Sequence, residues 1–261
     1  MAVVKKRSPL QIWGDVIFAI FLREIKGSFN DKFGLSWAII SPMIMVVVMV
    51  VIRQPFDGSD THGLSTVFFI IYGVLLVQFF LGVMEKTAGA IQKNKPLYAF
   101  RQVQPISSIL AIAAFELLVK FFLVLVIAII CFFIRIDVQI QDPLEIILLI
   151  FRVWIIAISV GTLLSLASCY VPEVKKLQIF ISRPLFFISG IFFSLQDIPQ
   201  EYWHYLTWNP LLHAVELARY AASPAYGDAG VSYFYLDAFT LLSLFLALAC
   251  YHIGWKQAIS R

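Results

Sequence analysis

Charged residues are scarce in this chain, and their scarcity sets its class. Only 14% of the 261 residues are charged and 61% are hydrophobic, whereas an ordinary soluble domain has about 25% charged and about 45–50% apolar residues. Uninterrupted apolar runs replace the apolar stripes that recur every three or four residues in a soluble amphipathic helix. Water is therefore not the main solvent of this chain.

Motifs that would indicate reactive chemistry are also missing. Cys131, Cys169 and Cys250 are far apart in apolar sequence and lack the close spacing of metal sites and redox pairs. The four histidines show no His-Glu-x-x-His pattern, and no Gly-x-Ser-x-Gly elbow occurs. We therefore predict neither a metal site nor a catalytic residue.

A phosphate-binding loop and a nucleic-acid face are absent as well. No glycine is followed by lysine, so the chain has no P-loop. If ATP powers the protein, another polypeptide must bind it. The net charge of +4 does not indicate a nucleic-acid partner, because the basic residues lie between apolar runs and form no clustered face.

Apolar runs of membrane-spanning length are abundant. About 20 such residues cross the roughly 30 Å of a bilayer's hydrocarbon core. We predict six spans, at about 34–53, 65–84, 105–134, 143–169, 178–195 and 234–254. The predicted fold class is an all-α integral membrane protein, with one transmembrane domain over residues 1–261.

Basic residues are distributed unevenly between the two sides of the predicted bundle. Six spans place both termini on one side, and fifteen of the 20 lysines and arginines fall on that side, against three on the other. Because basic residues near span ends stay in the cytoplasm, we predict that both termini are cytoplasmic.

Residues 9–29 precede the first span and have an amphipathic pattern. Asp15, Arg23 and Glu24 interrupt the run, and no small-residue cleavage site follows, so a signal peptide is not predicted. We predict an interfacial helix, with a simple cytoplasmic tail as the alternative. Polar and apolar residues fall on opposite sides of a helical wheel: Gln11, Asp15 and Lys26 against Trp13, Val16, Ile17 and Ile20.

Basic residues around the start of the first span could contact a lipid phosphate. Arg23, Lys26 and Lys32 lie near the predicted cytoplasmic face and would suit such a group. The positive-inside bias alone also places basic residues there.

Three ionisable residues lie inside predicted spans. Each costs roughly 2.5–3.5 kcal/mol on insertion scales and is a functional candidate by default. Glu116 and Lys120 are four apart and can form a pair along one helix, and Arg152 lies in the fourth span. They predict a polar path for an anionic or hydroxyl-rich substrate, or charges that only fix helix packing.

Small residues recur every four positions in the fourth predicted span. Ala157, Gly161 and Ser165 form the pattern that lets membrane helices approach closely. Packing within the chain is the favoured interpretation, and a dimer seam is the alternative.

Residues 196–233 are too polar to span a membrane yet too apolar for a solvated loop. Two short helices, at about 199–207 and 210–221, fit this stretch, with Asn209 and Pro210 between them. We predict a re-entrant helical hairpin over 197–221, between the fifth and sixth spans, because irregular backbone at membrane depth must be packed in protein or line a polar cavity.

Aromatic residues are dense in this hairpin. Aromatic faces can stack on sugar rings, so a groove that presents several of them could hold a glycan. The alternative is the aromatic belt of membrane interfaces. The candidate residues are Tyr202, Trp203, Tyr205 and Trp208.

The loop between the second and third predicted spans, residues 86–101, combines apolar and basic residues. Leu97 and Tyr98 lie close to Lys95 and Arg101, as expected of a helix that docks into a partner's groove. The alternative is a helix at the membrane interface with ordinary cytoplasmic charge.

Residues 181–219, ISRPLFFISGIFFSLQDIPQEYWHYLTWNPLLHAVELAR, resemble the signature of type 2 ABC exporter permeases. In that signature a kinked fifth span leads into an N-P-L-x-H-x-x-E-x-x-R helix, which here carries Asn209, Pro210, Glu216 and Arg219. Residues 22–42 resemble the family's interfacial helix running into its first span, and KNKPLYAFRQVQP matches its coupling helix. Short outer loops resemble the exporters of capsular polysaccharide, including polysialic-acid-type capsule, and their O-antigen and teichoic acid relatives.

The resemblance implies a homodimeric pore in a bacterial inner membrane. Two copies of a separate P-loop ATPase, which bind ATP and Mg, would drive a lipid-linked polysaccharide outward. Residues from Asn94 to Arg101 would lie in or beside the ATPase contact, and the hairpin 197–219 would gate the outer exit. For the capsule branch it further implies a periplasmic co-polymerase and an outer-membrane channel as partners.

Two other functions fit the same residues. One is a membrane-embedded enzyme acting on a lipid-linked sugar, with Glu116, Asp197 or His204 as acid or base. The other is a scaffold of envelope glycan assembly, which needs no polar path. No particular polysaccharide is predicted, because stacking aromatics and scattered polar groups tolerate many sugars.

Overall fold

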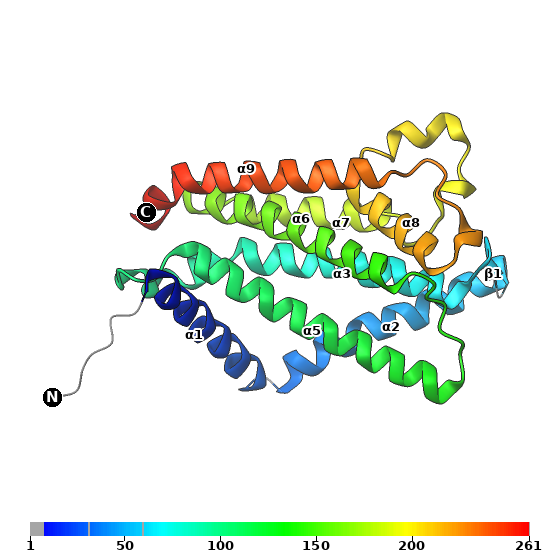
Figure 1. The fold of residues 1–261 in the computed structure, drawn as a ribbon, viewed down its shortest axis with the longest axis horizontal. Helices are drawn as coiled ribbons and strands as arrows, with labels where there is room; N and C mark the ends of the chain where they lie inside the picture. Colours follow the sequence, from blue (N-terminus) through cyan, green and yellow to red (C-terminus); the bar gives the residue numbers. More distant parts are fainter. Residues whose placement is uncertain (1–7, 31, 59, 261) are drawn as a thin grey trace.

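Long helices run side by side along the longest axis of the molecule (Figure 1). The computed structural model describes residues 8–30, 32–58 and 60–260. Within these ranges five helices are long and apolar enough to cross a membrane, so the protein is an all-helical membrane protein. They are α2 (Lys32–Asp57), α3 (Thr66–Ala88), α5 (Pro105–Ile134), α6 (Pro143–Tyr170) and α9 (Tyr233–Ser260).

Helix α1 (Pro9–Asn30) confirms the helix predicted over 9–29. It lies against the first half of α5 (Figure 1). Ile20 is buried against the bundle while Gln11 and Lys26 are exposed. The helix is thus present at the predicted position, and its place at the membrane interface stays a prediction.

The fifth predicted span, 178–195, differs most from the structure. Helix α7 (Val174–Ile188) has 15 residues, or about 22 Å at 1.5 Å per residue, against about 30 Å of hydrocarbon. It is not among the five candidate spans. The helix ends at Ile188 because Gly190 adopts a left-handed conformation, with a φ of 76°. The predicted continuation of this helix to residue 195 is therefore wrong.

A run of short helices follows α7. The helices predicted at about 199–207 and 210–221 correspond to η3 (Gln200–Tyr205), which is a shorter 3-10 helix, and to α8 (Pro210–Ala222). Pro210 stands in the first turn of α8, where its missing N–H costs nothing. The elements are η2 (Leu195–Asp197), η3 (Gln200–Tyr205), α8 (Pro210–Ala222) and η4 (Pro224–Tyr226).

A small β-hairpin, which the sequence analysis did not predict, joins α2 to α3. Strands β1 (Asp60–Thr61) and β2 (Leu64–Ser65) pair antiparallel around a turn at His62 and Gly63. Gly63 has a φ of 80° and lies against Ala225, so only glycine fits there. We call this end of the bundle, which also holds α8, the hairpin end. The start of α1 and the end of α9 lie at the opposite end, which we call the terminal end (Figure 1).

Helix α3 is the centre of the bundle, and α6 packs closely against it. In the span of α3, 72% of residues are buried, against 11% in α2. A side chain at Gly161 of α6 would collide with Thr87 of α3. The small-residue pattern that includes Ala157 and Ser165 therefore serves packing within the chain, the interpretation that the sequence analysis favours.

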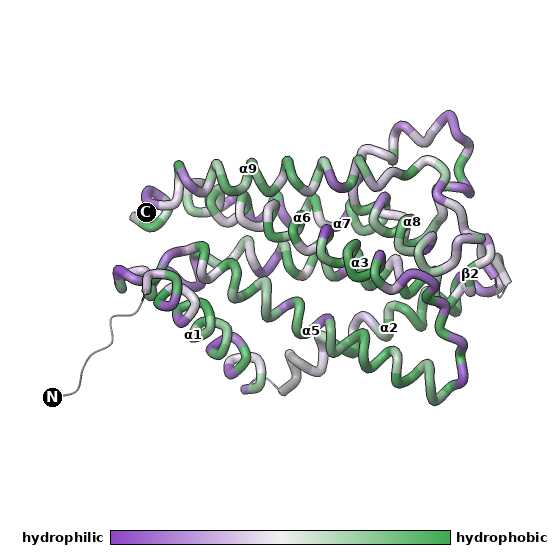
Figure 2. The backbone as a smooth tube through the Cα atoms, in the orientation of Figure 1, coloured by the Kyte–Doolittle hydropathy of each residue, from purple (hydrophilic) through white to green (hydrophobic). Residues whose placement is uncertain are grey.

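Hydropathy changes along the longest axis of the molecule. Hydrophobic residues dominate the long helices, and hydrophilic residues gather toward the two ends (Figure 2). At the terminal end, α4 (Ala90–Lys93) and η1 (Lys95–Ala99) connect α3 to α5. Polar groups that could bind partners or substrate are thus concentrated at the ends, with a few inside the spans.

Candidate functional site

A buried arginine organises the hairpin end. Arg219 of α8 is fully buried. It donates hydrogen bonds to the carbonyls of Phe69 (3.1 and 3.2 Å), Gly190 (2.7 Å) and Phe193 (3.3 Å) and forms an ion pair of 2.8 Å with Glu216. Its planar fork of donors therefore holds α3, α8 and the turn after α7 together.

Glu216 completes a polar network around this arginine. Its Oε2 lies 2.9 Å from the Tyr226 hydroxyl and 3.4 Å from Ser194 Oγ. The Tyr226 hydroxyl is also 2.6 Å from Ser194 Oγ. Because each of these side chains is buried, the network is stable only while all of its members have partners.

Asn209 fixes the start of α8. Its amide nitrogen donates to Ser189 Oγ (3.0 Å) and to the Ile188 carbonyl (3.3 Å). Its side-chain oxygen accepts from the Leu211 N–H at 3.0 Å. The residue caps α8 and at the same time satisfies the end of α7.

His213 is held as a neutral imidazole. The Ser232 N–H donates to its Nδ1 at 3.0 Å, so the proton must be on Nε2, which lies 2.7 Å from the Thr207 carbonyl. Burial lowers the pKa of His213, and the hydrogen bond to Thr207 only partly opposes this effect.

A second cluster of charged and polar side chains is centred on Asp197. Arg53 of α2 lies 3.6 Å from its Oδ2, and His62 Nε2 lies 2.7 Å from its Oδ1. Burial acts to raise the pKa of Asp197, but the Ser194 N–H, His62 and Arg53 together lower it below the usual value. Asp197 is therefore an ionised partner that joins α2, the β-hairpin and η2.

Two pairs at the terminal end join α1 to the segment between α3 and α5. Arg23 donates to the side-chain oxygen of Asn94, and Lys93 Nζ lies 2.5 Å from Glu24 Oε2. Asn94 is buried and also donates to the Ala90 carbonyl at 3.0 Å. It is thus an internal link and offers little surface to a partner.

The segment after Asn94 has one exposed and one packed side. Lys95, Phe100 and Arg101 are exposed, and the exposed fraction of Phe100 is 66%. Leu97 and Tyr98 are half-buried, and burial raises the pKa of Tyr98 to about 12. Beside this segment a cleft of about 340 Å³ is lined by Ile12, Asp15, Val16, Ala19 and Gln102.

A family model described as ABC-2 type transporter matches residues 15–222. The chain belongs to the ABC-2 type transporter family. It is 33% identical over 246 residues to the polysialic acid transport protein KpsM of Escherichia coli, with 94% of this chain and 95% of that protein covered. It is 24% identical over 242 residues to the capsule polysaccharide export inner-membrane protein CtrC of Neisseria meningitidis, with 90% and 89% covered. To BexB of Haemophilus influenzae, which has the same description as CtrC, it is 23% identical over 229 residues, with 87% and 85% covered.

The charges inside the spans of this ABC-2 transporter pair differently from the sequence expectation. Glu116, which is buried, forms its ion pair with Lys86 of α3 and not with Lys120. Gly82 of α3 lies beside the Glu116 carboxylate. Lys120 is half-buried and forms no ion pair within the described ranges, although Glu116 and Lys86 are its charged neighbours.

Arg152 has two carboxylate partners. It lies 2.7 Å from Glu145 and 2.6 Å from Asp237. Glu145 is in the first turn of α6 and Asp237 is near the start of α9, so this group belongs to the hairpin end. Both partners of Arg152 lie within the chain, and its place in a substrate path stays a prediction.

The aromatic residues of the ABC-2 hairpin fall into two groups. Tyr202, Tyr205 and Trp208 are exposed. Trp203 is half-buried, its N–H donates to the Ile198 carbonyl at 2.8 Å, and its ring packs against Gly230. The first three rings are available to a ligand, whereas Trp203 supports the loop.

The basic residues predicted to contact a lipid phosphate differ in their contacts within the chain. Arg23 is used by Asn94, and Lys26 is exposed. The side chain of Lys32 lies outside the described part of the structure.

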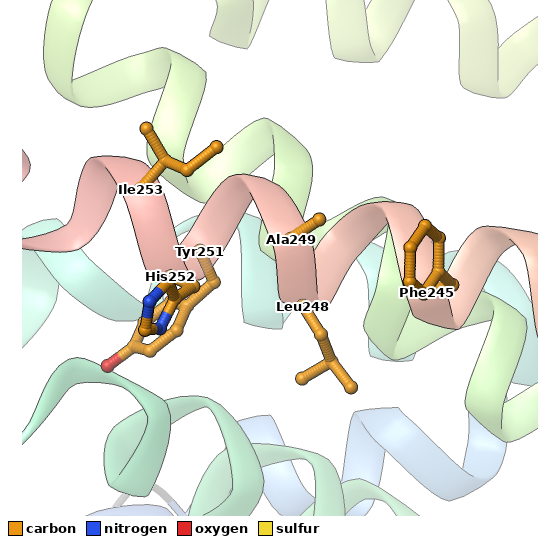
Figure 3. Close-up of a pocket in the computed structure, with 6 residues that line it drawn as sticks. All are labelled: Phe245, Leu248, Ala249, Tyr251, His252 and Ile253. Carbon is orange, nitrogen blue, oxygen red and sulfur yellow. The ribbon is translucent and has the colours of Figure 1, made fainter.

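Several residues that shape these sites escaped the sequence analysis. Lys86, Arg53 and Tyr226 pair with groups at least ten positions away, and such pairs have no periodic signal in one sequence. Among the residues that the structure describes, no group of three or more His, Cys, Asp or Glu could hold a metal ion. A shallow groove of about 540 Å³ along α9 contains none of the predicted site residues (Figure 3); its lining is Phe245, Leu248, Ala249, Tyr251, His252 and Ile253.

Proposed function

We propose that this chain is the membrane permease of an ABC exporter that carries a capsular, or related lipid-linked, polysaccharide across the bacterial inner membrane. The observation that supports it is the match to the polysialic acid transport protein KpsM over 94% of this chain and 95% of that protein. The names of CtrC and BexB, which export capsule polysaccharide from the inner membrane, point the same way. A separate ATPase, in two copies that bind ATP and Mg, would power a homodimer of this chain.

In this proposal the chain crosses the membrane six times, with α7 as a short fifth crossing. The terminal end, with both termini, faces the cytoplasm, and the hairpin end faces outward. The excess of basic residues on the terminal side supports this orientation. The segment 197–221 then forms a re-entrant hairpin, whose gate residues Asn209, Pro210, Glu216 and Arg219 fix its shape.

The ATPase docks on the segment from Asn94 to Arg101. Lys95, Phe100 and Arg101 supply its exposed surface, while Leu97 and Tyr98 pack beneath them. Asn94 contributes by holding α1 through Arg23. The docking surface therefore has a charged rim around one large apolar side chain, as protein interfaces commonly do.

The polymer passes a charged position in the membrane and an aromatic surface at the outward end. Glu116, with Lys86 and Lys120, forms the first, and Tyr202, Tyr205 and Trp208 form the second. Arg23, Lys26 and Lys32 lie where a lipid phosphate would enter from the cytoplasmic side. A periplasmic co-polymerase and an outer-membrane channel would receive the polymer.

The first test is mass spectrometry of what copurifies with the chain after gentle extraction from its own membrane. A near-stoichiometric P-loop ATPase is the expected result. The purified complex should then move a lipid-linked polysaccharide into inverted vesicles only when ATP is supplied. Repeated extraction without any ATPase, or product formation from lipid-linked sugar without nucleotide, would contradict the proposal.

A further inference from the structure

Helix α2 is embedded in the bundle less deeply than its neighbour α3. Its span is 11% buried, against 72% for α3. Ile44, Val47 and Val51 expose an apolar face along its length. The opposite face of α2, with Val46 and Met49, packs on the core, and polar contacts at the hairpin end add to this packing.

Arg53 supplies contacts at the hairpin end of α2. Its Nη1 donates to the Phe192 carbonyl, and its Nη2 lies 3.6 Å from Asp197 Oδ2. Its guanidinium carbon is 4.1 Å from the centroid of the Phe69 ring, which adds a cation–π contact. One side chain thus ties α2 both to α3 and to the segment after α7.

The partners of Arg53 belong to a firmly connected group, which we call the α8 unit: α3, residues 189–226 and the β-hairpin. Arg219 bonds the carbonyls of Phe69, Gly190 and Phe193. The β-hairpin joins the unit where Ser223 Oγ donates to the Gly63 carbonyl at 3.0 Å. Relative to this unit, α2 is the separate element.

Exposure differs sharply between the Arg219–Glu216 pair at the centre of the α8 unit and the Arg53–Asp197 pair at its boundary with α2. The Arg219 and Glu216 side chains are 0% and 3% exposed, whereas Arg53 and Asp197 are 13% and 38% exposed. Separating a buried pair leaves unsolvated charges, but water readily replaces the partners of a partly exposed one. The contact between α2 and the α8 unit therefore costs less to separate than the Arg219–Glu216 pair at the centre of the unit.

The other end of α2 leads to the proposed ATPase contact. Helix α1 ends at Asn30 and α2 begins at Lys32. Arg23 of α1 binds Asn94 at the start of the docking segment, and Glu24 binds Lys93 just before it. A movement of the docking region can thus reach the hairpin end through α1 and α2, by contacts that the structure shows.

We propose that Arg53 is a positioning residue that latches α2 to the α8 unit, and that its release opens the outward exit during transport. This inference rests on the proposed export function. It assigns the moving boundary to α2 against the α8 unit and leaves the re-entrant hairpin itself rigid. Arg53 acts through α2 and does not touch the reacting ATP.

The test locks the latch reversibly. In the full complex with its ATPase, Cys131, Cys169 and Cys250 are replaced by alanine, and Arg53→Cys and Asp197→Cys are joined by a short, reducible bis-methanethiosulfonate linker. We expect the linker to lower ATP-driven polymer transport at least tenfold and reduction to restore it. A misfolded variant would not recover on reduction. If the linked form transports polymer as fast as the form whose linker has been cleaved by reduction, the proposal is overturned.

A matched control places the same linker inside the α8 unit. His62→Cys with Asp197→Cys uses the neighbouring contact of 2.7 Å and shares one cysteine with the test pair. We expect linked and reduced forms to transport within twofold of each other. Tenfold loss in this control also overturns the proposal, because it would show that movement within the unit is required.

A second measurement separates this inference from the proposed function. Arg53→Gln, without any linker, removes the charge of the latch, and we expect ATP hydrolysis without polymer to rise at least twofold. Unchanged hydrolysis counts against the latch. A complex that hydrolyses ATP but moves no polysaccharide under any condition counts against the export function, while the response of hydrolysis to the linker still reports the release of α2.

Discussion

Arg219 and Phe69 are in direct contact: the guanidinium carbon lies 3.4 Å from the centroid of the Phe69 ring, while the same arginine donates to the Phe69 carbonyl. Arg53 approaches the same ring at 4.1 Å. One phenylalanine of the central helix therefore contacts two arginines, one fixed inside the α8 unit and one arriving from α2. Phe69 therefore contacts both the buried centre of the α8 unit and the proposed latch.

Arg219→Ala should lower the free energy of unfolding by roughly 3–5 kcal/mol, because it leaves Glu216 buried without its cation. Thermal unfolding of the purified chain in detergent measures the loss. Arg219→Met combined with Glu216→Leu should cost less than Arg219→Ala, since no charge then stays buried unpaired. A double variant less stable than the single one would contradict this account.

The docking segment should separate into binding and supporting residues. Lys95→Ala, Phe100→Ala and Arg101→Ala together should weaken copurification of the ATPase while leaving the melting temperature nearly unchanged, since these side chains are exposed. Asn94→Ala should instead lower stability by about 1–3 kcal/mol, because Arg23 and the Ala90 carbonyl lose a buried partner. Equal effects of both variants on stability would refute the division.

Glu116 should be coupled to Lys86 more strongly than to Lys120. A double-mutant cycle with Glu116→Gln and Lys86→Met is expected to give an interaction energy of about 0.5–3 kcal/mol, the usual range for residues in contact. The cycle with Lys120→Met serves as the control and should give less. The reverse order would restore the pairing along one helix that the spacing predicts.

The aromatic residues of the hairpin should differ in whether they support transport or stability. Tyr202→Ala, Tyr205→Ala and Trp208→Ala together should reduce polymer transport while each changes stability by no more than about 0.5 kcal/mol. Trp203→Ala should destabilise the chain by roughly 1–3 kcal/mol, because its ring packs on Gly230 and its N–H is bonded. Normal transport by the triple variant would remove the sugar contact from the proposed function.

His213 should make stability fall in acid. Because burial lowers its pKa in the folded chain, the unfolded chain takes up the proton first as the pH falls. The contribution of His213 to stability is therefore fully present above the ordinary histidine pKa of about 6.5. It is lost as the pH drops through the pKa of His213 in the folded chain. Melting temperatures between about pH 8 and pH 5 test this, and His213→Gln should flatten the dependence in that window.

Sequence patterns were most informative where local periodicity decides the structure. The helix at 9–29, the five apolar spans and the start of α8 at Asn209 all follow from patterns within one segment. The end of α7 did not, because apolar residues continue past Gly190 while the backbone turns there. Hydropathy records solubility in the bilayer and does not record a change of backbone direction.

Residue spacing in one sequence does not predict which side chains pair between distant segments. Spacing indicated Glu116 with Lys120, but a tertiary contact brought Lys86 to Glu116 instead. Arg152 had a usable signal, since Glu145 lies two helical turns away on the same face. Arg53 had none, because its partner Asp197 is distant in the chain and lies in an irregular segment.

The short length of α7 has an electrostatic consequence. At about 22 Å, this helix covers about 8 Å less than the hydrocarbon core, and the residues after it are turns whose carbonyls are bonded by Arg219. If α7 crosses the membrane as proposed, non-helical backbone completes that crossing. The positive charge of Arg219 then stabilises carbonyl dipoles that no helical N–H satisfies.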